Sequence, residues 1–350
     1  MKRITVGFVL LLCMGVLFGG WYSNSWSKKG QCVLHETAFD MVVWGYGVCS
    51  ASNPAFSVFS PATGFSVSFK GDIVATVLGD GSGFTGEWVS LPFASLDWRL
   101  AKPITLVAEI VRKRDFSFVV KDSSYISGIG VVQEIEGKGG VHAFNLGLAV
   151  GGTFIGGYAL LSYGVLSRRE HWACGVEGQE GWYDFFAFSS APGIEGGVGI
   201  LTPWRMGFGA VVWYLKPMEG VQSVTSSSGR EDSLEFSFQL PLEWRISGAV
   251  DAGALDFYVG IYGEDSALAG FGGGVEIYKW LQWRLGGGYM TDEGSSGIQV
   301  GLGLGWHTKA GGMLDIGVVL KRRHYNIVGD NIPVEYALEW MVSFRSSERW

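Results

Sequence analysis

Charged residues are scarce in this chain of 350 residues, since Asp, Glu, Lys and Arg make up only 17% of it, whereas a soluble domain has about 25%. The mean hydropathy is positive, at +0.23. Beyond the N-terminus, however, the sequence has no run of about 20 apolar residues, which excludes a transmembrane helix there. An apolar chain without an apolar run is typical of a transmembrane β-barrel, whose apolar residues occupy alternate positions.

Basic, metal-binding and catalytic residues are also few. The formal net charge of −7 and the lack of basic blocks argue against a nucleic-acid partner. Cys32 and His35 have a ligand-like spacing, but a single pair does not make a metal site. The glycine-rich pieces, such as "GLGLG", lie inside an alternating strand and are not followed by a helix start, so they are not phosphate loops. We therefore expect neither an enzyme, nor a cofactor, nor a metal.

The stretch "SLEFSFQLPLEWRI", residues 233–246, shows what the chain has instead. Every second residue from Leu234 to Ile246 is apolar, and the residues between them are mostly polar or charged. A period of two predicts a strand. The alternation outlasts the usual strand of about 5–6 residues and would suffice for a tilted membrane-spanning strand, which needs roughly 9–11.

The same pattern recurs along the chain, for example in "GFSVSFKG", "LQWRLGGGYM", "SGIQVGLGLGWH" and "PVEYALEWMVSFR". With the weaker copies it predicts an all-β transmembrane antiparallel β-barrel of about 14 strands over residues 63–350, an even number being expected. Trp and Tyr near strand ends fit aromatic girdles, although a soluble β-sandwich would also hold aromatic residues. Two weakly patterned stretches, 168–192 and 217–231, are predicted to be surface loops.

Some charged residues share the polar face of their strands and are candidates for the barrel lumen. The alternative is that they only hydrate the interior, and a histidine among them is better explained as part of a polar wall than as a catalyst. The lumen-facing candidates are Glu235, Glu243, Arg245, Arg284, His307, Glu335, Glu339 and Arg345.

The two ends of the chain carry export signals. Residues 1–25 combine a basic start with an apolar core and predict a secretory signal peptide cleaved after Ser25. An uncleaved anchor helix, or a lipoprotein modified at Cys13, is the alternative. Export permits a disulfide between Cys32 and Cys49, although three mature cysteines leave one over. The terminal Trp350 resembles an outer-membrane assembly signal, which implies the outer-membrane assembly machinery as a partner.

Residues 26–62 lack the two-residue period, and their place before the first strand suggests a plug. They include "ASNPAF", residues 51–56. This segment resembles the N-terminal hatch of the FadL-type long-chain fatty-acid transporter family, in which a hatch that carries an Asn-Pro-Ala motif plugs a barrel of fourteen strands. Asn53, Pro54 and Ala55 match the motif, while Phe56 and Ser57 stand where the family usually has Gly-Leu.

The resemblance implies uptake of long-chain fatty acids or other small hydrophobic molecules across the outer membrane, with outer-membrane lipid as surroundings. It implies that Asn53, Pro54, Ala55 and Phe56 lie at the lower part of a ligand pocket, whereas "NPAF" could also be a simple turn before the first strand. It further implies sideways release of ligand through the barrel wall. The alternative functions are a general porin and an accessory barrel for secretion or surface adhesion.

Overall fold

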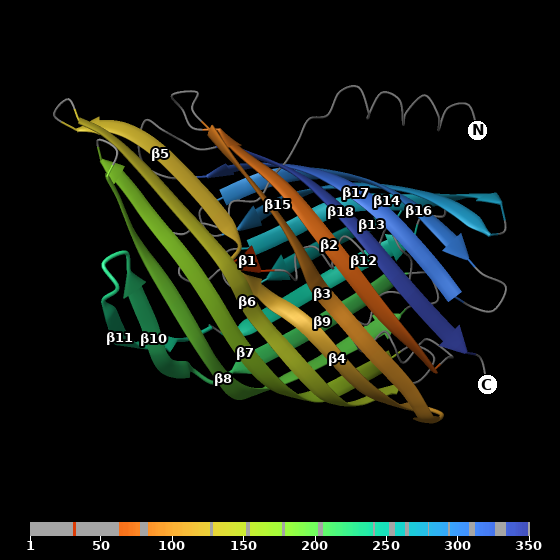
Figure 1. The fold of residues 1–350 in the computed structure, drawn as a ribbon. Coiled ribbons are helices and arrows are strands. Elements are labelled where there is room, and N and C mark those ends of the chain that lie inside the picture. The colour runs from red at the N-terminus through yellow and green to blue at the C-terminus, as the bar shows by residue number, and fades with distance from the viewer. Residues whose placement is uncertain are drawn as a thin grey trace.

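The computed structural model describes residues 31–32, 63–77, 83–126, 129–151, 155–176, 179–201, 206–240, 242–251, 256–262, 266–278, 280–292, 295–307, 312–325 and 334–348. In this part of the chain no helix is long and apolar enough to cross a membrane. The described residues form a single sheet of eighteen strands (Figure 1).

The strands are long, as the extended alternation predicts. They are β1 (Gln31–Cys32), β2 (Thr63–Val77), β3 (Gly83–Ala101), β4 (Ile104–Asp115), β5 (Phe118–Ile126), β6 (Ile129–Gly151), β7 (Ile155–Val176), β8 (Gln179–Leu201), β9 (Met206–Leu215), β10 (Met218–Ser226), β11 (Glu231–Phe238), β12 (Glu243–Asp251), β13 (Asp256–Tyr262), β14 (Ser266–Tyr278), β15 (Leu281–Asp292), β16 (Ser295–His307), β17 (Gly312–Tyr325) and β18 (Val334–Glu348).

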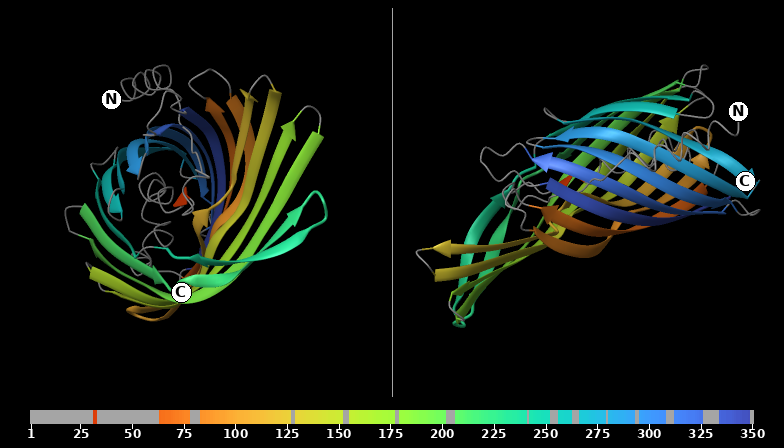
Figure 2. Two further views of the ribbon diagram at one scale, coloured as in Figure 1. Left: turned by 90° about the vertical axis from the view of Figure 1, so that its left-hand side faces the viewer. Right: turned by 90° about the horizontal axis from the view of Figure 1, so that it is seen from above.

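Antiparallel pairings lead around the sheet in a ring, which Figure 2 shows end-on. The order is β2, β3, β4, β6, β7, β8, β9 and then β12 to β18, and β18 pairs in turn with β2. Among the described strands, fourteen belong to this ring, which agrees with the predicted number. Strands β1, β5, β10 and β11 are side branches: β1 pairs with β4, β5 with β6, and β10 with β8 and β11.

The polarity of the ring is the reverse of a soluble protein. On β7, Leu161 is 73% exposed, whereas the neighbouring Ser162 is 5% exposed. On β18, Glu335 and Glu339 are buried while Leu338 is exposed. Apolar side chains outside and polar side chains inside are the pattern of a barrel that faces lipid. The predicted all-β barrel is therefore confirmed.

The predicted surface loops are strands instead. Residues 168–192 cover the outer part of the β7–β8 hairpin, and residues 217–231 contain β10, which pairs with the same part of β8. These hairpins project beyond the rest of the barrel (Figure 1). Many side chains between residues 169 and 186 are exposed or half-buried on both faces of the hairpin. No face of it needs an apolar stripe, so the strands lack a clear period of two.

The stretch 233–246 is also not one continuous strand. It divides into β11, which pairs with β10, and β12, which pairs with β9 and β13. Leu240 and Leu242 share one parity, yet Leu240 is 2% exposed and Leu242 is 55% exposed. Phe236, Phe238 and Leu240 thus pack toward the interior, whereas Leu242 and Ile246 are exposed, because β11 and β12 pair with different strands.

Candidate ligand channel

The inner face of β4, β6, β7, β8 and β9 carries side chains in three layers along the barrel. Inward-facing positions recur every second residue on each strand, so neighbouring strands contribute to the same layer. The first layer is a small apolar cluster at the end of the barrel where β4 begins and β6 ends, opposite the projecting hairpins. It consists of Val107, Ala149, Tyr158, Leu160 and Val211.

The second layer is a buried polar network. Lys113 Nζ donates to Glu195 Oε2 over 2.6 Å, and the two side chains are 1% and 3% exposed. Asn145 Nδ2 donates both to Glu109 Oε1, at 2.8 Å, and to Glu195 Oε2, at 3.1 Å. The Tyr158 hydroxyl donates to Glu195 Oε1 at 3.1 Å. These hydrogen bonds hold two carboxylates and one ammonium in fixed positions away from water.

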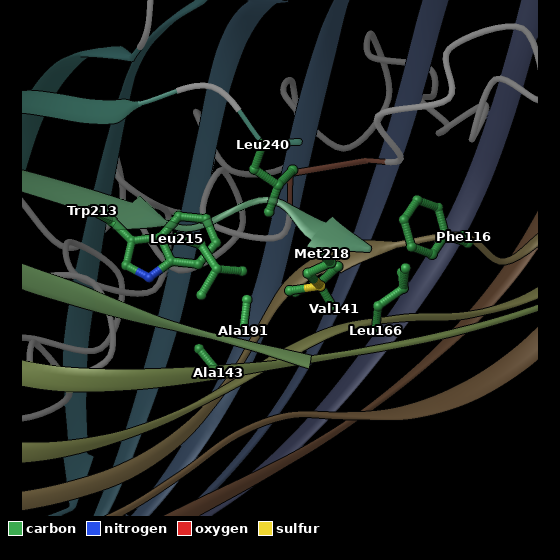
Figure 3. Close-up of a cluster of buried hydrophobic side chains, with 9 residues drawn as sticks. All are labelled: Phe116, Val141, Ala143, Leu166, Ala191, Trp213, Leu215, Met218 and Leu240. Atoms are coloured by element: carbon green, nitrogen blue, oxygen red, sulfur yellow. The ribbon is translucent and has the colours of Figure 1, made fainter. Parts of the chain in front are cut away.

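The third layer is the largest apolar cluster of the described residues, drawn in Figure 3. It lies on the side of the polar network that faces the projecting hairpins. Phe236 and Phe238 of β11, which is not a ring strand, also pack against it. The cluster consists of Phe116, Val141, Ala143, Leu166, Ala191, Trp213, Leu215, Met218 and Leu240.

Phe116 reaches this cluster because β4 leaves the barrel wall. The last β3–β4 pair is Phe93 with Val111, and the β4–β6 register shifts between Arg112 and Arg114. In β3, the bulge opposite Phe69 contains Pro92, which has no N–H to donate to a neighbouring strand. The bulge at Pro92 in β3 and the register shift after Arg112 in β4 thus both lie where the β3–β4 ladder ends, and from this point β4 bends into the barrel.

Hydrogen bonds fix the bend, residues 112–117. Arg112 Nη2 donates to Asp115 Oδ1 at 2.6 Å and to the Gly139 carbonyl at 2.7 Å. The Phe116 amide donates to the same carbonyl at 2.9 Å, and the Ser117 amide donates to Asp115 Oδ1 at 2.8 Å. Gly139 has φ +117, and a Cβ there would lie 2.0 Å from the Ser167 carbonyl oxygen. Only glycine fits this position of β6 without strain.

The inward bend leaves an interruption in the wall. Residues 83–90 of β3 pair with β2, and β5 pairs with β6, but among the described residues no ladder joins β3 to β5. Figures 1 and 2 show β5 and the adjoining part of β6 diverging from β3. We refer to this interruption as the β3–β5 break.

A segment from the N-terminal region takes the place of β3 beside the bend. β1 pairs Gln31 with Asp115 and Cys32 with Arg114, while β6 pairs with the same two residues of β4. β1 lies inside the ring in the end-on view (Figure 2). The bend is therefore a three-stranded junction between the wall and the N-terminal segment.

Comparison with known proteins identifies the fold. No family profile and no curated protein matches the sequence. Solved structures do match, among them the Pseudomonas putida toluene transporter TodX, at 12% identity over 96% of this chain and 100% of that one, with a TM-score of 0.63. The chain has the fold of a FadL-type barrel. A Pseudomonas aeruginosa FadL homologue matches at 9% identity over 95% and 100%, with a TM-score of 0.57. The Ralstonia pickettii toluene transporter TbuX matches at 12% over 92% and 100%, with a TM-score of 0.58.

Three of the predicted lumen residues are buried or half-buried on ring strands. Glu339 on β18 lies 3.3 Å from Lys70 Nζ and 2.5 Å from Lys321 Nζ, so it joins β2, β17 and β18. Glu335 is fully buried on the same strand. Glu243 on β12 accepts a hydrogen bond from Arg114 on β4.

The remaining predicted residues are placed differently or lie outside the description. Glu235 differs from its expected lumen position: it is exposed on β11, a side branch of the ring, because the neighbouring Phe236 turns toward the apolar cluster. The backbones of Arg245, Arg284, His307 and Arg345 lie in β12, β15, β16 and β18, but their side chains are not described. Asn53, Pro54, Ala55 and Phe56, the signal peptide, Cys49 and Trp350 lie outside the described residues, as does most of the predicted hatch, 26–62.

Sequence reasoning missed the residues of the bend. The segment "VRKRD" at 111–115 puts three basic residues in succession inside an otherwise alternating strand. In a regular strand they could not all face the interior, so the run itself is a signal for a bulge. Within the described residues, no group of three or more His, Cys, Asp or Glu is arranged to hold a metal ion.

Proposed function

We propose that this protein is an outer-membrane channel that takes up small hydrophobic molecules and releases them sideways through its wall. The observation that carries the proposal is the position of the large apolar cluster. It lies inside a lipid-facing barrel, and Phe116 of the same cluster belongs to the bend that opens the β3–β5 break. An apolar molecule held at this cluster is close to an interruption through which it can leave without crossing the polar network.

The rest of the barrel supports a route in that direction. The projecting hairpins β5–β6, β7–β8 and β10–β11 mark the outer side, because the longer connections of such barrels face outward. Between the apolar cluster and the opposite end lies the network of Lys113, Glu195 and Asn145, which an apolar solute could cross only by losing its apolar contacts. Sideways exit into the lipid keeps the solute in an apolar environment throughout.

The N-terminal segment completes the proposal. Residues 1–25 are the signal peptide, 26–62 the hatch and 63–350 the barrel, with Asn53, Pro54, Ala55 and Phe56 in the hatch next to the ligand. β1 supports this arrangement, since it pairs with the bend inside the barrel. A hatch attached at this point can change the width of the β3–β5 break when ligand binds.

Uptake by cells tests the proposal. The protein is expressed in a Gram-negative host that lacks its own FadL-type barrel, and the initial rates of radiolabelled toluene and oleate uptake are compared with those of an empty-vector control. Toluene represents neutral hydrocarbons, since TodX and TbuX are toluene transporters, and oleate represents fatty acids. Faster uptake of either supports the proposal. If neither solute enters faster than in the empty-vector control, although the protein is present in the outer membrane, the proposal is contradicted.

A further inference from the structure

Two ion pairs reach from the bend to distant strands of the barrel. Lys113 binds Glu195 of β8, three ring positions from β4, and Arg114 binds Glu243 of β12, five positions away. We refer to them as the cross-barrel ion pairs. The third basic residue, Arg112, binds Asp115 within the bend itself. Each basic residue of the run therefore has its own carboxylate.

The first cross-barrel pair is held from several sides. Lys113 Nζ lies 5.0 Å from the centre of the Trp213 ring on β9, in addition to its contact with Glu195. Glu195 is fixed by Asn145 and Tyr158, which come from β6 and β7. Four strands of the wall thus position the ammonium group of one residue of the bend.

Without these pairs, β4 could continue straight and pair with β3 instead of bending into the barrel. The edge of β3 at residues 83–90 pairs with β2 on one side, and a straight continuation of β4 would offer it a ladder on the other. A straight β4 would withdraw Lys113 and Arg114 from their carboxylates, and buried charges that lose their partners are strongly destabilising. The pairs therefore favour the bent form over the straight one.

We infer that Lys113–Glu195 and Arg114–Glu243 are positioning pairs that keep the β3–β5 break open, so that they control the release of ligand. The inference rests on the proposed function in taking the break as the exit. Its structural part, that the pairs determine the separation of β3 and β5, stands without that function.

The test removes the charges while keeping the side-chain shapes, with Lys113→Met and Glu195→Gln in one variant and Arg114→Met and Glu243→Gln in a second. The matched control is Lys321→Met with Glu339→Gln, an equally buried pair between β17 and β18, away from the bend. Spin labels at Val89 on β3 and Ser123 on β5, with the native cysteines replaced by serine, report the separation by double electron–electron resonance. Heat-modifiable gel migration shows that each variant is folded.

We expect a shorter Val89–Ser123 distance in either cross-barrel variant and an unchanged distance in the control. Uptake of the solute that the wild type transports should fall about tenfold in these variants, because the exit through the wall closes. An unchanged distance in both folded variants, or an equal change in the control, would overturn the inference. If the wild type transports neither solute, the proposed function fails, but the distance measurement still decides the structural inference.

Discussion

Phe116 and Phe238 meet edge to face, with their ring centres 5.6 Å apart. Phe116 follows the end of β4 inside the barrel, and Phe238 ends β11, a side branch of the ring. The contact joins the inward bend to the β10–β11 hairpin, and both residues border the same apolar cluster (Figure 3 shows Phe116). The outer hairpin and the wall interruption are therefore parts of one packed unit.

Replacing Phe116 by alanine should damage this unit. The side chain is buried, and truncating a buried phenylalanine costs about 3–5 kcal/mol. We expect a loss of this size in the free energy of unfolding, measured by urea titration in liposomes, together with weaker binding of N-phenylnaphthylamine. Phe188→Ala is the control, because Phe188 is exposed on the outside of β8. An equal effect of the two substitutions would contradict the packing that we describe.

Gly139→Ala should disturb the bend from the opposite strand. The new methyl group would meet the Ser167 carbonyl in a backbone conformation that alanine rarely adopts. The Gly139 carbonyl would then move away from Arg112 and the Phe116 amide. We expect a loss of about 1–3 kcal/mol in the free energy of unfolding. Gly229→Ala is a useful comparison, since Gly229 also has a positive φ but lies in an exposed turn without close neighbours.

Leu161→Lys tests which surface faces lipid. Leu161 is among the most exposed apolar residues of the outer wall and lies in the first half of β7, away from the projecting end of the β7–β8 hairpin. A lysine on the lipid face near the bilayer centre should cost about 2–4 kcal/mol of unfolding free energy in liposomes. Glu235→Lys, on the exposed β11 strand, should be close to neutral. If Leu161→Lys were as mild as Glu235→Lys, the wall at this height would not be in the hydrocarbon region.

Deletion of residues 50–57 tests the predicted hatch. If Asn53, Pro54 and Ala55 lie at the ligand, the deletion should weaken binding of the fluorescent probe, and the conductance of single channels should rise because the plug is incomplete. The folded state is checked by heat-modifiable migration. Unchanged affinity and conductance would mean that "NPAF" is only a turn before the first strand.

The sequence predicts the barrel well because one physical rule acts along its whole length. Each ring strand has one face toward lipid and one toward the interior, so the period of two appears directly in segments such as 334–346. The number of alternating segments also predicts about fourteen strands, which is the number in the ring. The rule does not apply to the outer part of the β7–β8 hairpin, because both of its faces are exposed there. The sequence therefore predicts loops where the structure has strands.

The bend could not be predicted in the same way, because its partners are distant along the chain. Nothing near Lys113 in the sequence points to Glu195, and only the fold brings the two together. Leu240 and Leu242 show the same limit, since a bend in the chain reverses the face that the alternation assigns. For this reason the alternation predicts Glu235 in the lumen, although it is exposed on β11. Glu243, which begins β12, accepts a hydrogen bond from Arg114 of β4.

The most direct test of the central claim is binding of a hydrophobic probe by the purified protein folded in detergent. N-phenylnaphthylamine fluorescence is titrated against the wild type and competed with toluene and with oleate. We predict saturable binding that at least one competitor displaces and that Phe116→Ala weakens. The absence of saturable binding by a protein that keeps its heat-modifiable migration would contradict the proposal that this barrel carries hydrophobic molecules.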